Sequence, residues 1–151
     1  MALDLFDELT GLLADLERGG AEYAIAGAIA LAIHGVPRAT ADIDLLVPGE
    51  HVERALEIAR GRGFTVAAAP MRFSDGQQLR RVTKLQGEDA LTLDLLIVGP
   101  ALEAVWAERV SVPLEDGSVW VVSRQGLVQM KALAGRDQDF ADIRRLQEAD
   151  R

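Results

Sequence analysis

Two aspartates, Asp42 and Asp44, are the residues of this sequence best suited to do chemistry. They lie in an apolar run over 42–47 that is typical of a β-strand, and side chains two apart in a strand point to the same face. Carboxylates held this close repel each other, and a partly buried sheet screens the repulsion weakly. A divalent cation would offset it, and Mg²⁺ prefers one or two carboxylates together with substrate phosphates. The alternative is an ordinary surface pair at a strand end.

A third carboxylate, Asp94, interrupts an otherwise apolar strand pattern over 91–98. An acid in such a strand is costly unless it is paired or bound to a metal. Beside a metal-binding pair it would bind a second ion and accept the proton of an attacking hydroxyl, as phosphoryl-type transfer requires. The alternative is an ion pair with Arg80 or Arg81 on a neighbouring strand.

Small residues mark the turn between a predicted strand over 23–26 and the helix that follows it. Gly27 and Ala28 leave backbone N–H groups free at the start of the helix, where its dipole favours a phosphate. On this turn alone, the preferred interpretation is that small residues let the helix pack closely on the sheet.

One of the two lysines in the chain, Lys131, lies on the apolar side of a predicted helix over 123–134. A solvated charge is not expected there, so its side chain reaches either into a site or along the apolar surface to water. Asp139 and Asp142 lie three apart in the last helix. They would orient Lys131 or Arg136, or form an ordinary surface pair, which is the preferred interpretation.

The hydrophobic pattern predicts the scaffold that must hold these residues. Helices are expected over 3–18, 28–34, 50–61, 100–108 and 123–134, with a last helix from Asp137 that carries Phe140, Ile143 and Leu146 on one side. Strands are expected over 23–26, 42–47, 64–68, 79–85, 91–98, 110–114 and 118–122, with a loop over 69–78 and a tight hairpin turn at Glu115-Asp116-Gly117. The pattern indicates a single α/β (α+β) domain over 1–151, with a mixed central sheet flanked by helices.

Composition limits the class of protein. The chain has 151 residues, of which 49% are hydrophobic and 26% charged, so it is not a disordered chain. With no cysteine it has no disulfide, thiolate zinc site or cysteine nucleophile. No apolar run approaches the roughly 18 residues of a membrane span, and the early acids are not typical of a secretory signal. We therefore expect a cytoplasmic protein with no membrane partner.

Charge is unevenly distributed along the chain. The net charge of −8 disfavours indiscriminate binding to nucleic acid. Residues 51–84, however, carry seven Arg and Lys against three acids. This basic segment would either contact a phosphate-bearing partner or form a solvated, arginine-rich surface.

Together, the acids and the small-residue turn resemble the nucleotidyltransferase superfamily of DNA polymerase β type. That superfamily has a Gly-Gly or Gly-Ser turn, an acid–hydrophobic–acid step and a third acid on a later strand. More narrowly, the stretches 25–31 and 38–44 resemble the abortive-infection AbiEii-type nucleotidyltransferases. So does the tail, Ser123-Arg124-Gln125-Gly126-Leu127 followed by Lys131, Arg136, Asp139 and Asp142. The resemblance covers a core of about 20–146, preceded by the helix over 3–18.

The resemblance implies a role for each matching residue. The catalytic and metal-binding residues would be Asp42, Asp44 and Asp94, holding two Mg²⁺ ions or Mn²⁺ in their place, with Lys131 reaching the nucleotide. The nucleotide-binding residues would be Gly27, Ala28, Arg38 and Thr40. Ala28 departs from the Gly or Ser usual in the family, so a hydroxyl contact to phosphate is lost while the backbone contact remains.

The implied function is enzymatic: transfer of a nucleoside monophosphate from an NTP to an acceptor hydroxyl. The acceptor would be an RNA or tRNA end in a toxin–antitoxin system, with a cognate antitoxin as a further partner. A small-molecule acceptor, as in antibiotic nucleotidyltransferases, is the main enzymatic alternative. A non-catalytic module that binds a nucleotide or a partner is the contrasting class, and the presence of all three acids favours transfer.

Overall fold

The computed structural model describes residues 3–115 and 117–149, so Asp116 of the predicted hairpin turn lies outside the described residues. The helices are α1 (Leu5–Arg18), α2 (Gly27–Ile33), α3 (Val52–Gly61), α4 (Glu103–Ala107), α5 (Arg124–Ala134) and α6 (Asp137–Ala149). Short 3-10 turns at Gly49–His51 and Pro100–Leu102 precede α3 and α4. The strands are β1 (Ala24–Ala26), β2 (Asp42–Pro48), β3 (Phe64–Ala67), β4 (Met71–Arg72), β5 (Gln78–Gln86), β6 (Asp89–Val98), β7 (Val110–Leu114) and β8 (Gly117–Val121).

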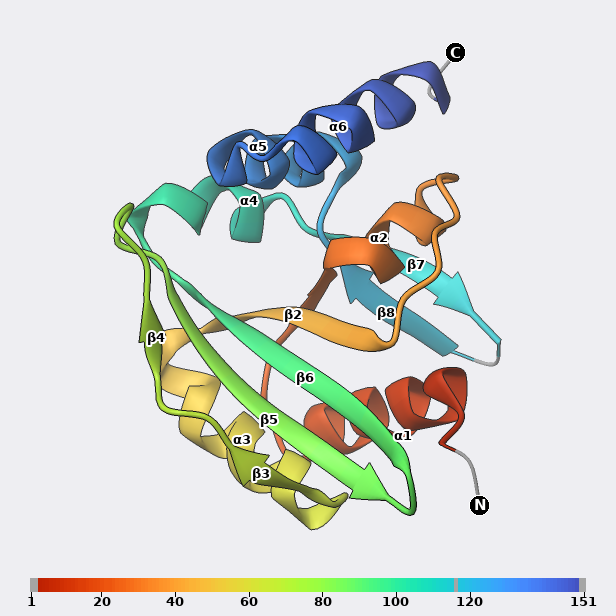
Figure 1. The fold of residues 1–151 in the computed structure, drawn as a ribbon, viewed down its shortest axis with the longest axis vertical. Helices are drawn as coiled ribbons and strands as arrows, with labels where there is room; N and C mark the ends of the chain where they lie inside the picture. Colours follow the sequence, from red (N-terminus) through yellow and green to blue (C-terminus); the bar gives the residue numbers. More distant parts are fainter. Residues whose placement is uncertain (1–2, 116, 150–151) are drawn as a thin grey trace.

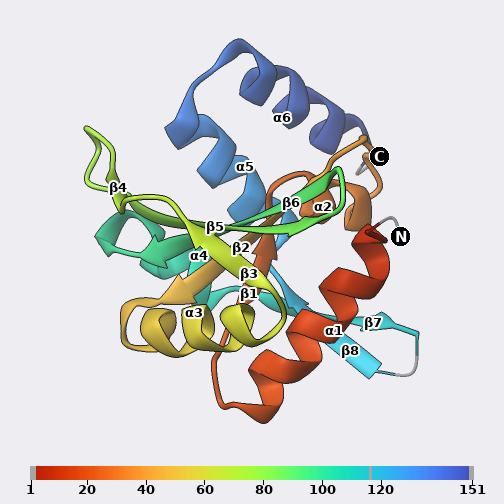
Figure 2. The same cartoon turned by 60° about the horizontal axis from the view of Figure 1, so that its bottom comes forward.

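The strands form one mixed sheet in the order β3-β5-β6-β2-β1-β8-β7, with β4 paired to β5 (Figure 1). The pairs β2–β6 and β1–β8 are parallel, and the other pairs are antiparallel. Figure 2 shows α1 and α3 on one side of the sheet and α5 and α6 on the other. The predicted α/β class with a mixed sheet flanked by helices is therefore confirmed. Within 3–115 and 117–149, no helix is long and apolar enough to cross a membrane.

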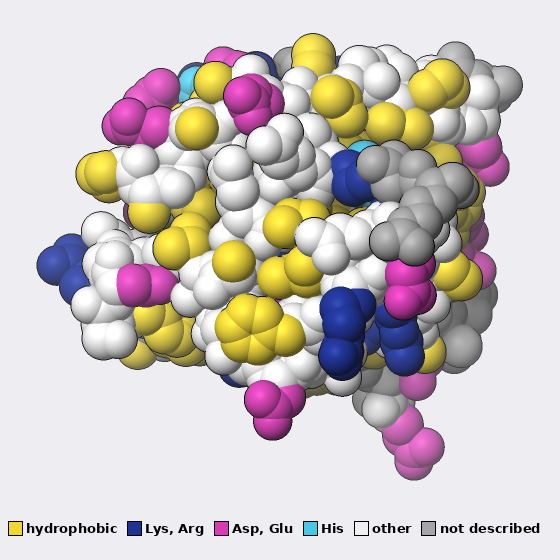
Figure 3. Space-filling model, turned by 90° about the horizontal axis from the view of Figure 1, so that it is seen from above, with side chains coloured by type: hydrophobic (Ala, Val, Ile, Leu, Met, Phe, Trp, Pro, Cys, Tyr) yellow, Lys and Arg dark blue, Asp and Glu magenta, His cyan; other side chains and the backbone are white. Residues whose placement is uncertain are grey.

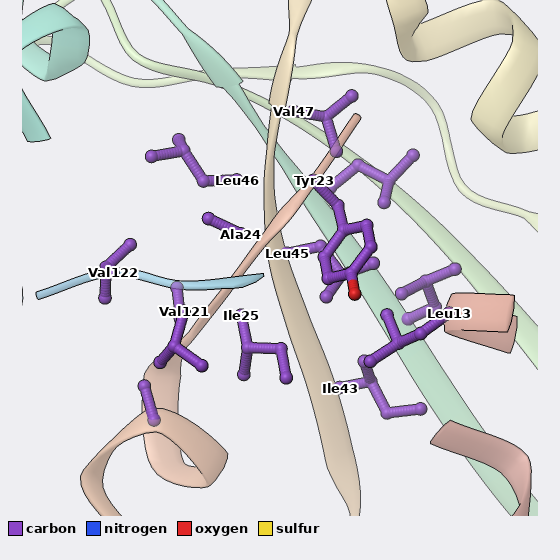
Figure 4. Close-up of a cluster of buried hydrophobic side chains, with 14 of the residues drawn as sticks. Leu13, Tyr23, Ala24, Ile25, Ile43, Leu45, Leu46, Val47, Val121 and Val122 are labelled. Carbon is purple, nitrogen blue, oxygen red and sulfur yellow. The ribbon is translucent and has the colours of Figure 1, made fainter. Parts of the chain in front are cut away.

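The core lies on both sides of the central strands, because successive side chains of β2 point to opposite faces of the sheet. Ile43 and Leu45 are fully buried, and Ile43 lies beside Leu13 of α1 (Figure 4). Burying an aliphatic side chain of this size contributes about 1.5–3 kcal/mol. Because neighbouring residues of a strand face opposite ways, burial of Ile43 and Leu45 directs Asp42 and Asp44 to the other side, toward α5.

The ends of α5 are set by Ser123 and Gly135. The Ser123 hydroxyl accepts a hydrogen bond from the backbone N–H of Gly126 at 2.9 Å. Gly135 ends the helix with φ +66°, a left-handed conformation that glycine adopts without a steric cost. These caps fix the helical turn on which Lys131 lies.

Two features of the structure differ from the sequence predictions. The predicted loop over 69–78 contains β4, whose two residues are too few to give a periodic signal. On α6, Phe140 is 51% exposed although it lies on the same predicted side as Leu146, which is buried, and the buried residues also include Asp139 and Asp142. The interpretation of these two acids as a surface pair is therefore wrong. They face cations of other elements, and those contacts decide which side of α6 is buried.

Candidate active site

A row of paired residues crosses the middle of the sheet. Ala26 of β1 pairs with Asp44 of β2, Asp44 pairs with Asp94 of β6, and Asp94 pairs with Arg81 of β5. Paired residues lie on the same face, and neighbouring strands are about 4.8 Å apart. Asp42 lies two residues before Asp44, on the same face. The register therefore places the three acids predicted from the sequence side by side.

Asp94 is held by an arginine of the neighbouring strand. Nε and an Nη atom of Arg81 donate to the two carboxylate oxygens of Asp94 at 2.7 and 2.9 Å. This is the ion pair considered as the alternative for Asp94, and it involves Arg81, whereas Arg80 bonds to Glu53. Such a two-pronged contact fixes the orientation of the carboxylate. Arg81 was not among the predicted site residues, although the antiparallel pairing of β5 and β6 brings it there.

Asp44 is the most strongly perturbed acid of the row. Burial, followed by the charges of Asp94 and Asp42, raises the pKa of Asp44 to about 6, while Lys131 and Arg81 act in the opposite direction. Its ionised form is therefore disfavoured and would be stabilised by a cation beside it.

The turn into α2 lies against Asp44. Gly27 has φ +65°, and a Cβ added there would lie 2.8 Å from Cγ of Asp44 and still closer to a carboxylate oxygen. Position 27 therefore requires glycine both for its backbone conformation and for the space that Asp44 occupies. Thr40 acts on the other acid of β2, because its hydroxyl accepts a hydrogen bond from the backbone N–H of Asp42 at 3.1 Å.

Opposite the acids, cations of α5 and of two connecting segments are held by buried carboxylates of α6. Nζ of Lys131 lies 3.0 Å from Asp142 and 3.5 Å from Asp139. Arg38 donates to Asp142 at 2.6 Å, and Arg136 donates to both oxygens of Asp139. Burial by itself would raise the pKa of Asp142, but hydrogen bonds from Lys131 and Gln138 outweigh it and hold that pKa below its usual value. Lys131 is thus part of an ion-pair network at the site.

A cleft of about 730 Å³ lies between the acids and these helices. The predicted residues that line it are Gly27, Ala28, Arg38, Thr40, Asp42, Asp44, Asp94 and Lys131. It is also lined by residues that the sequence did not single out as functional: Phe73, Ser74, Asp75, Gln77, Leu79, Arg81, Leu96, Met130 and Leu133. Turn chemistry in 69–78 indicated a loop, but nothing local in the sequence placed that loop over the acids.

The acids match Mg²⁺ in donor chemistry. Within the described residues, no three His, Cys, Asp or Glu side chains are grouped so that they could hold a metal ion by themselves. Mg²⁺, however, usually takes only one or two protein carboxylates and completes its shell with water and substrate phosphates. The two acids of β2 supply such oxygen donors, and burial together with the charges of Asp94 and Asp42 raises the pKa of Asp44, an effect that a bound cation would oppose.

The basic segment over 51–84 is largely neutralised by the chain itself. Arg62 bonds to Asp15, Lys84 to Glu8, Arg80 to Glu53 and Arg81 to Asp94. These ion pairs leave little of the segment's positive charge for a phosphate-bearing partner. Seen from the side of α5 and α6, the surface shows acidic, basic and hydrophobic side chains interspersed (Figure 3).

Neither a protein-family model nor a curated protein sequence matches this chain. Solved structures do resemble it. A Thermotoga maritima protein provisionally described as a nucleotidyltransferase has a TM-score of 0.64 and 17% identity, covering 95% of this chain and 92% of that protein. The solution structure of the antibiotic-resistance factor ANT(2″)-Ia has a TM-score of 0.62 and 15% identity, covering 93% and 80%. Its crystal structure with adenylyl-2″-tobramycin has a TM-score of 0.60 and 16% identity, covering 91% and 84%.

These likenesses establish the fold. The chain has the fold of the nucleotidyltransferases, with helices and a mixed sheet that correspond over nearly its whole length. They do not distinguish the AbiEii-type group from other nucleotidyltransferases.

Proposed function

We propose that this protein is a nucleotidyltransferase that moves a nucleoside monophosphate from an NTP to an acceptor hydroxyl. One observation carries the proposal: acids from β2 and β6, the Gly27 turn and Lys131 all line a single cleft. The shared fold supports it, and one protein of that fold, ANT(2″)-Ia, was solved with an adenylylated antibiotic. We further propose that residues 1–151 form one domain that acts in the cytoplasm.

In this proposal Asp42 and Asp44 bind Mg²⁺, or Mn²⁺ in its place, and Asp94 contributes to the site of a second ion. The bound metal supplies neutralisation of the charge that develops on the phosphates. Lys131 and Arg38, which we call the cation-bearing wall, face the cleft from the side opposite the acids. Their positive charges neutralise the same phosphate charge. Backbone N–H groups of Gly27 and Ala28 contact the triphosphate, and Thr40 keeps Asp42 in place through its backbone hydrogen bond.

The transfer step is a displacement at the α-phosphorus of the NTP. The acceptor oxygen forms a bond to the α-phosphorus, the bond from that phosphorus to the bridging oxygen of the β-phosphate breaks, and pyrophosphate leaves. Asp94 accepts the hydroxyl proton, in an orientation fixed by Arg81. Lys131 stabilises the charge on the transferring group.

The AbiEii-type resemblance suggests an RNA or tRNA end as the acceptor, with a cognate antitoxin as partner. Two observations favour a small-molecule acceptor as a second candidate. The basic segment is occupied by internal ion pairs, and the fold is shared with an antibiotic-modifying protein. A non-catalytic domain of this fold would bind the NTP but would not transfer the nucleoside monophosphate.

The test is Mg²⁺-dependent transfer of label from each of four α-labelled NTPs into total RNA, total protein and a small-molecule fraction. Asp44→Asn removes a proposed ligand, and Asp137→Asn is the matched control, because Asp137 is exposed on α6. We expect label in one fraction with the wild type and with Asp137→Asn, and none with Asp44→Asn. Thermal stabilisation by NTP without transfer to any fraction would indicate a binding module. Absence of both would overturn the proposal.

A further inference from the structure

The cleft changes character from one end of the residue row to the other. At the β1 end it is bounded by the turn at Gly27, and in the middle lie the acids. Beside Arg81, along β5 and β6, the lining includes two leucines. Leu79 of β5 pairs with Leu96 of β6, two residues along from the Arg81–Asp94 pair and therefore on the same face of the sheet.

An aromatic ring adds to this apolar lining. Phe73 lies in the turn between β4 and β5, lines the cleft and is 48% exposed. Its backbone is held by the turn, because its N–H donates to the carbonyl of Gln77 at 2.8 Å and its carbonyl accepts from Gly76 at 3.0 Å. The Asp75 carboxylate also accepts a hydrogen bond from the backbone N–H of Gln77 at 3.0 Å. This ordered turn holds the half-exposed ring of Phe73 against the cleft. Exposed apolar surface in a cleft is typical of a binding site.

The geometry of the transfer step indicates which substrate would bind beside Phe73, Leu79 and Leu96, an inference that rests on the proposed function. In-line displacement places the attacking oxygen and the leaving pyrophosphate on opposite sides of the α-phosphorus. If pyrophosphate leaves toward the Gly27 turn, the acceptor hydroxyl approaches from the side of Asp94 and Arg81. Phe73, Leu79 and Leu96 lie on that side.

We propose that Phe73, Leu79 and Leu96 form the acceptor subsite, and that it takes an acceptor with an uncharged planar ring beside its hydroxyl, as in a nucleoside. A nucleobase stacks on a phenyl ring whatever its sequence context, and Leu79 and Leu96 provide apolar surface beneath it. Ser74 and Gln77 of the same turn line the cleft and offer polar atoms to the edge of such a ring. The ring belongs either to the terminal nucleoside of an RNA or to a small molecule.

The test measures acceptor binding without turnover, in the absence of NTP. The probes are free adenosine and a labelled RNA tetranucleotide that ends in adenosine with a free 3′-hydroxyl. Phe73→Ala removes the ring, Phe73→Trp keeps a ring, and Phe140→Ala is the matched control because Phe140 is similarly exposed but does not line the cleft. Thermal stabilisation by NTP is measured separately for every variant.

We expect Phe73→Ala to weaken binding of at least one probe by about tenfold, while Phe73→Trp and Phe140→Ala bind it as the wild type does. Sensitivity confined to the tetranucleotide would identify an RNA end, and sensitivity to free adenosine would identify a small acceptor. Unchanged binding in Phe73→Ala, or no binding of either probe by the wild type, would overturn the proposal. So would loss of NTP stabilisation in Phe73→Ala, because the ring would then contact the donor. A wild type that NTP does not stabilise would instead count against the proposed function.

Discussion

The folded structure disfavours the ionised form of Asp44. Its pKa of about 6 compares with an ordinary value of 3.8, and the largest cause is burial, followed by its two acidic neighbours. The folded protein therefore holds a proton on Asp44 at pH values where the unfolded chain has released it. The contribution of Asp44 to stability is therefore most favourable below about pH 4, decreases as pH rises from there to about 6, and remains reduced above that. Once ionised, Asp44 therefore lowers the stability of the fold.

We predict that Asp44→Asn raises the thermal midpoint of the metal-free protein at pH 8, because the neutral amide removes an unfavourable charge. Near pH 4 the difference should shrink, since Asp44 is then protonated. Calorimetry in the presence of a chelator, at both pH values and with Asp137→Asn as control, measures this. A lower midpoint at pH 8 would mean that the carboxylate stabilises the fold.

Gly27 provides a second test at the scale of one residue. Alanine there meets a steric cost of about 1–2 kcal/mol for a positive φ, and its Cβ collides with Asp44. Gly87→Ala is the matched control, because Gly87 has φ +60° with no neighbouring atom within 4 Å. We predict that both variants lose stability in denaturant unfolding, and that only Gly27→Ala also loses nucleotide transfer. Equal activity in the two variants would show that the close approach to Asp44 is dispensable.

At the scale of elements, Asp142 ties three parts of the chain together. It is fully buried on α6, binds Lys131 of α5, and accepts a hydrogen bond from Arg38 in the segment that leads into β2. One carboxylate thus links the cation-bearing wall of the cleft to the strand that carries Asp42 and Asp44. The helices and the sheet are positioned relative to each other partly through this contact.

We predict that Asp142→Asn lowers the free energy of unfolding by about 2 kcal/mol, the scale of hydrogen bonds to charged groups. It should also speed amide hydrogen exchange over 34–41, where Arg38 loses its partner, and raise KM for NTP more than it lowers kcat. Asp137→Asn, on the same helix but exposed, should change none of these. Unaltered exchange over 34–41 would contradict the linking role.

The elements also show what the sequence could and could not predict. Long periodic patterns, such as those of α1, β2 and β6, identified the elements, and the spacing of Asp42, Asp44 and Asp94 identified the acids that the register brings together. On α6 the sequence contains two overlapping stripes, one apolar with Phe140 and one acidic with Asp139. The acidic stripe is buried because its partners, including Arg38 about a hundred residues earlier, lie there. A contact of that range leaves no trace in local periodicity.

At the scale of the whole molecule, internal ion pairs engage part of the basic segment over 51–84. Lys84 and Arg62 hold acids of α1, and these contacts fasten α1 to the far side of the sheet from the cleft. The molecule therefore combines a net charge of −8 with internal ion pairs at four of the seven cations of residues 51–84.

We predict a shallow salt dependence for binding of any single-stranded RNA. Neutralising one or two phosphates gives a logarithmic slope of about −0.7 per phosphate, so affinity should fall less than about tenfold between 50 and 200 mM salt. Fluorescence anisotropy with a labelled oligonucleotide measures the slope. A fall of a hundredfold or more would show that the cations of 51–84 exchange their internal partners for phosphates.

The parallel pairing of β2 with β6 has a consequence for the order in which the molecule is made. Asp44 and Asp94 are fifty residues apart in the sequence and become neighbours only when β2 pairs with β6, and Lys131 opposite them is held by Asp142 of α6. A growing chain that has emerged from the ribosome only as far as β6 has its acids but lacks the wall that faces them. The cleft is thus complete only after α5 and α6 have been made, and a product truncated after β6 carries only part of it.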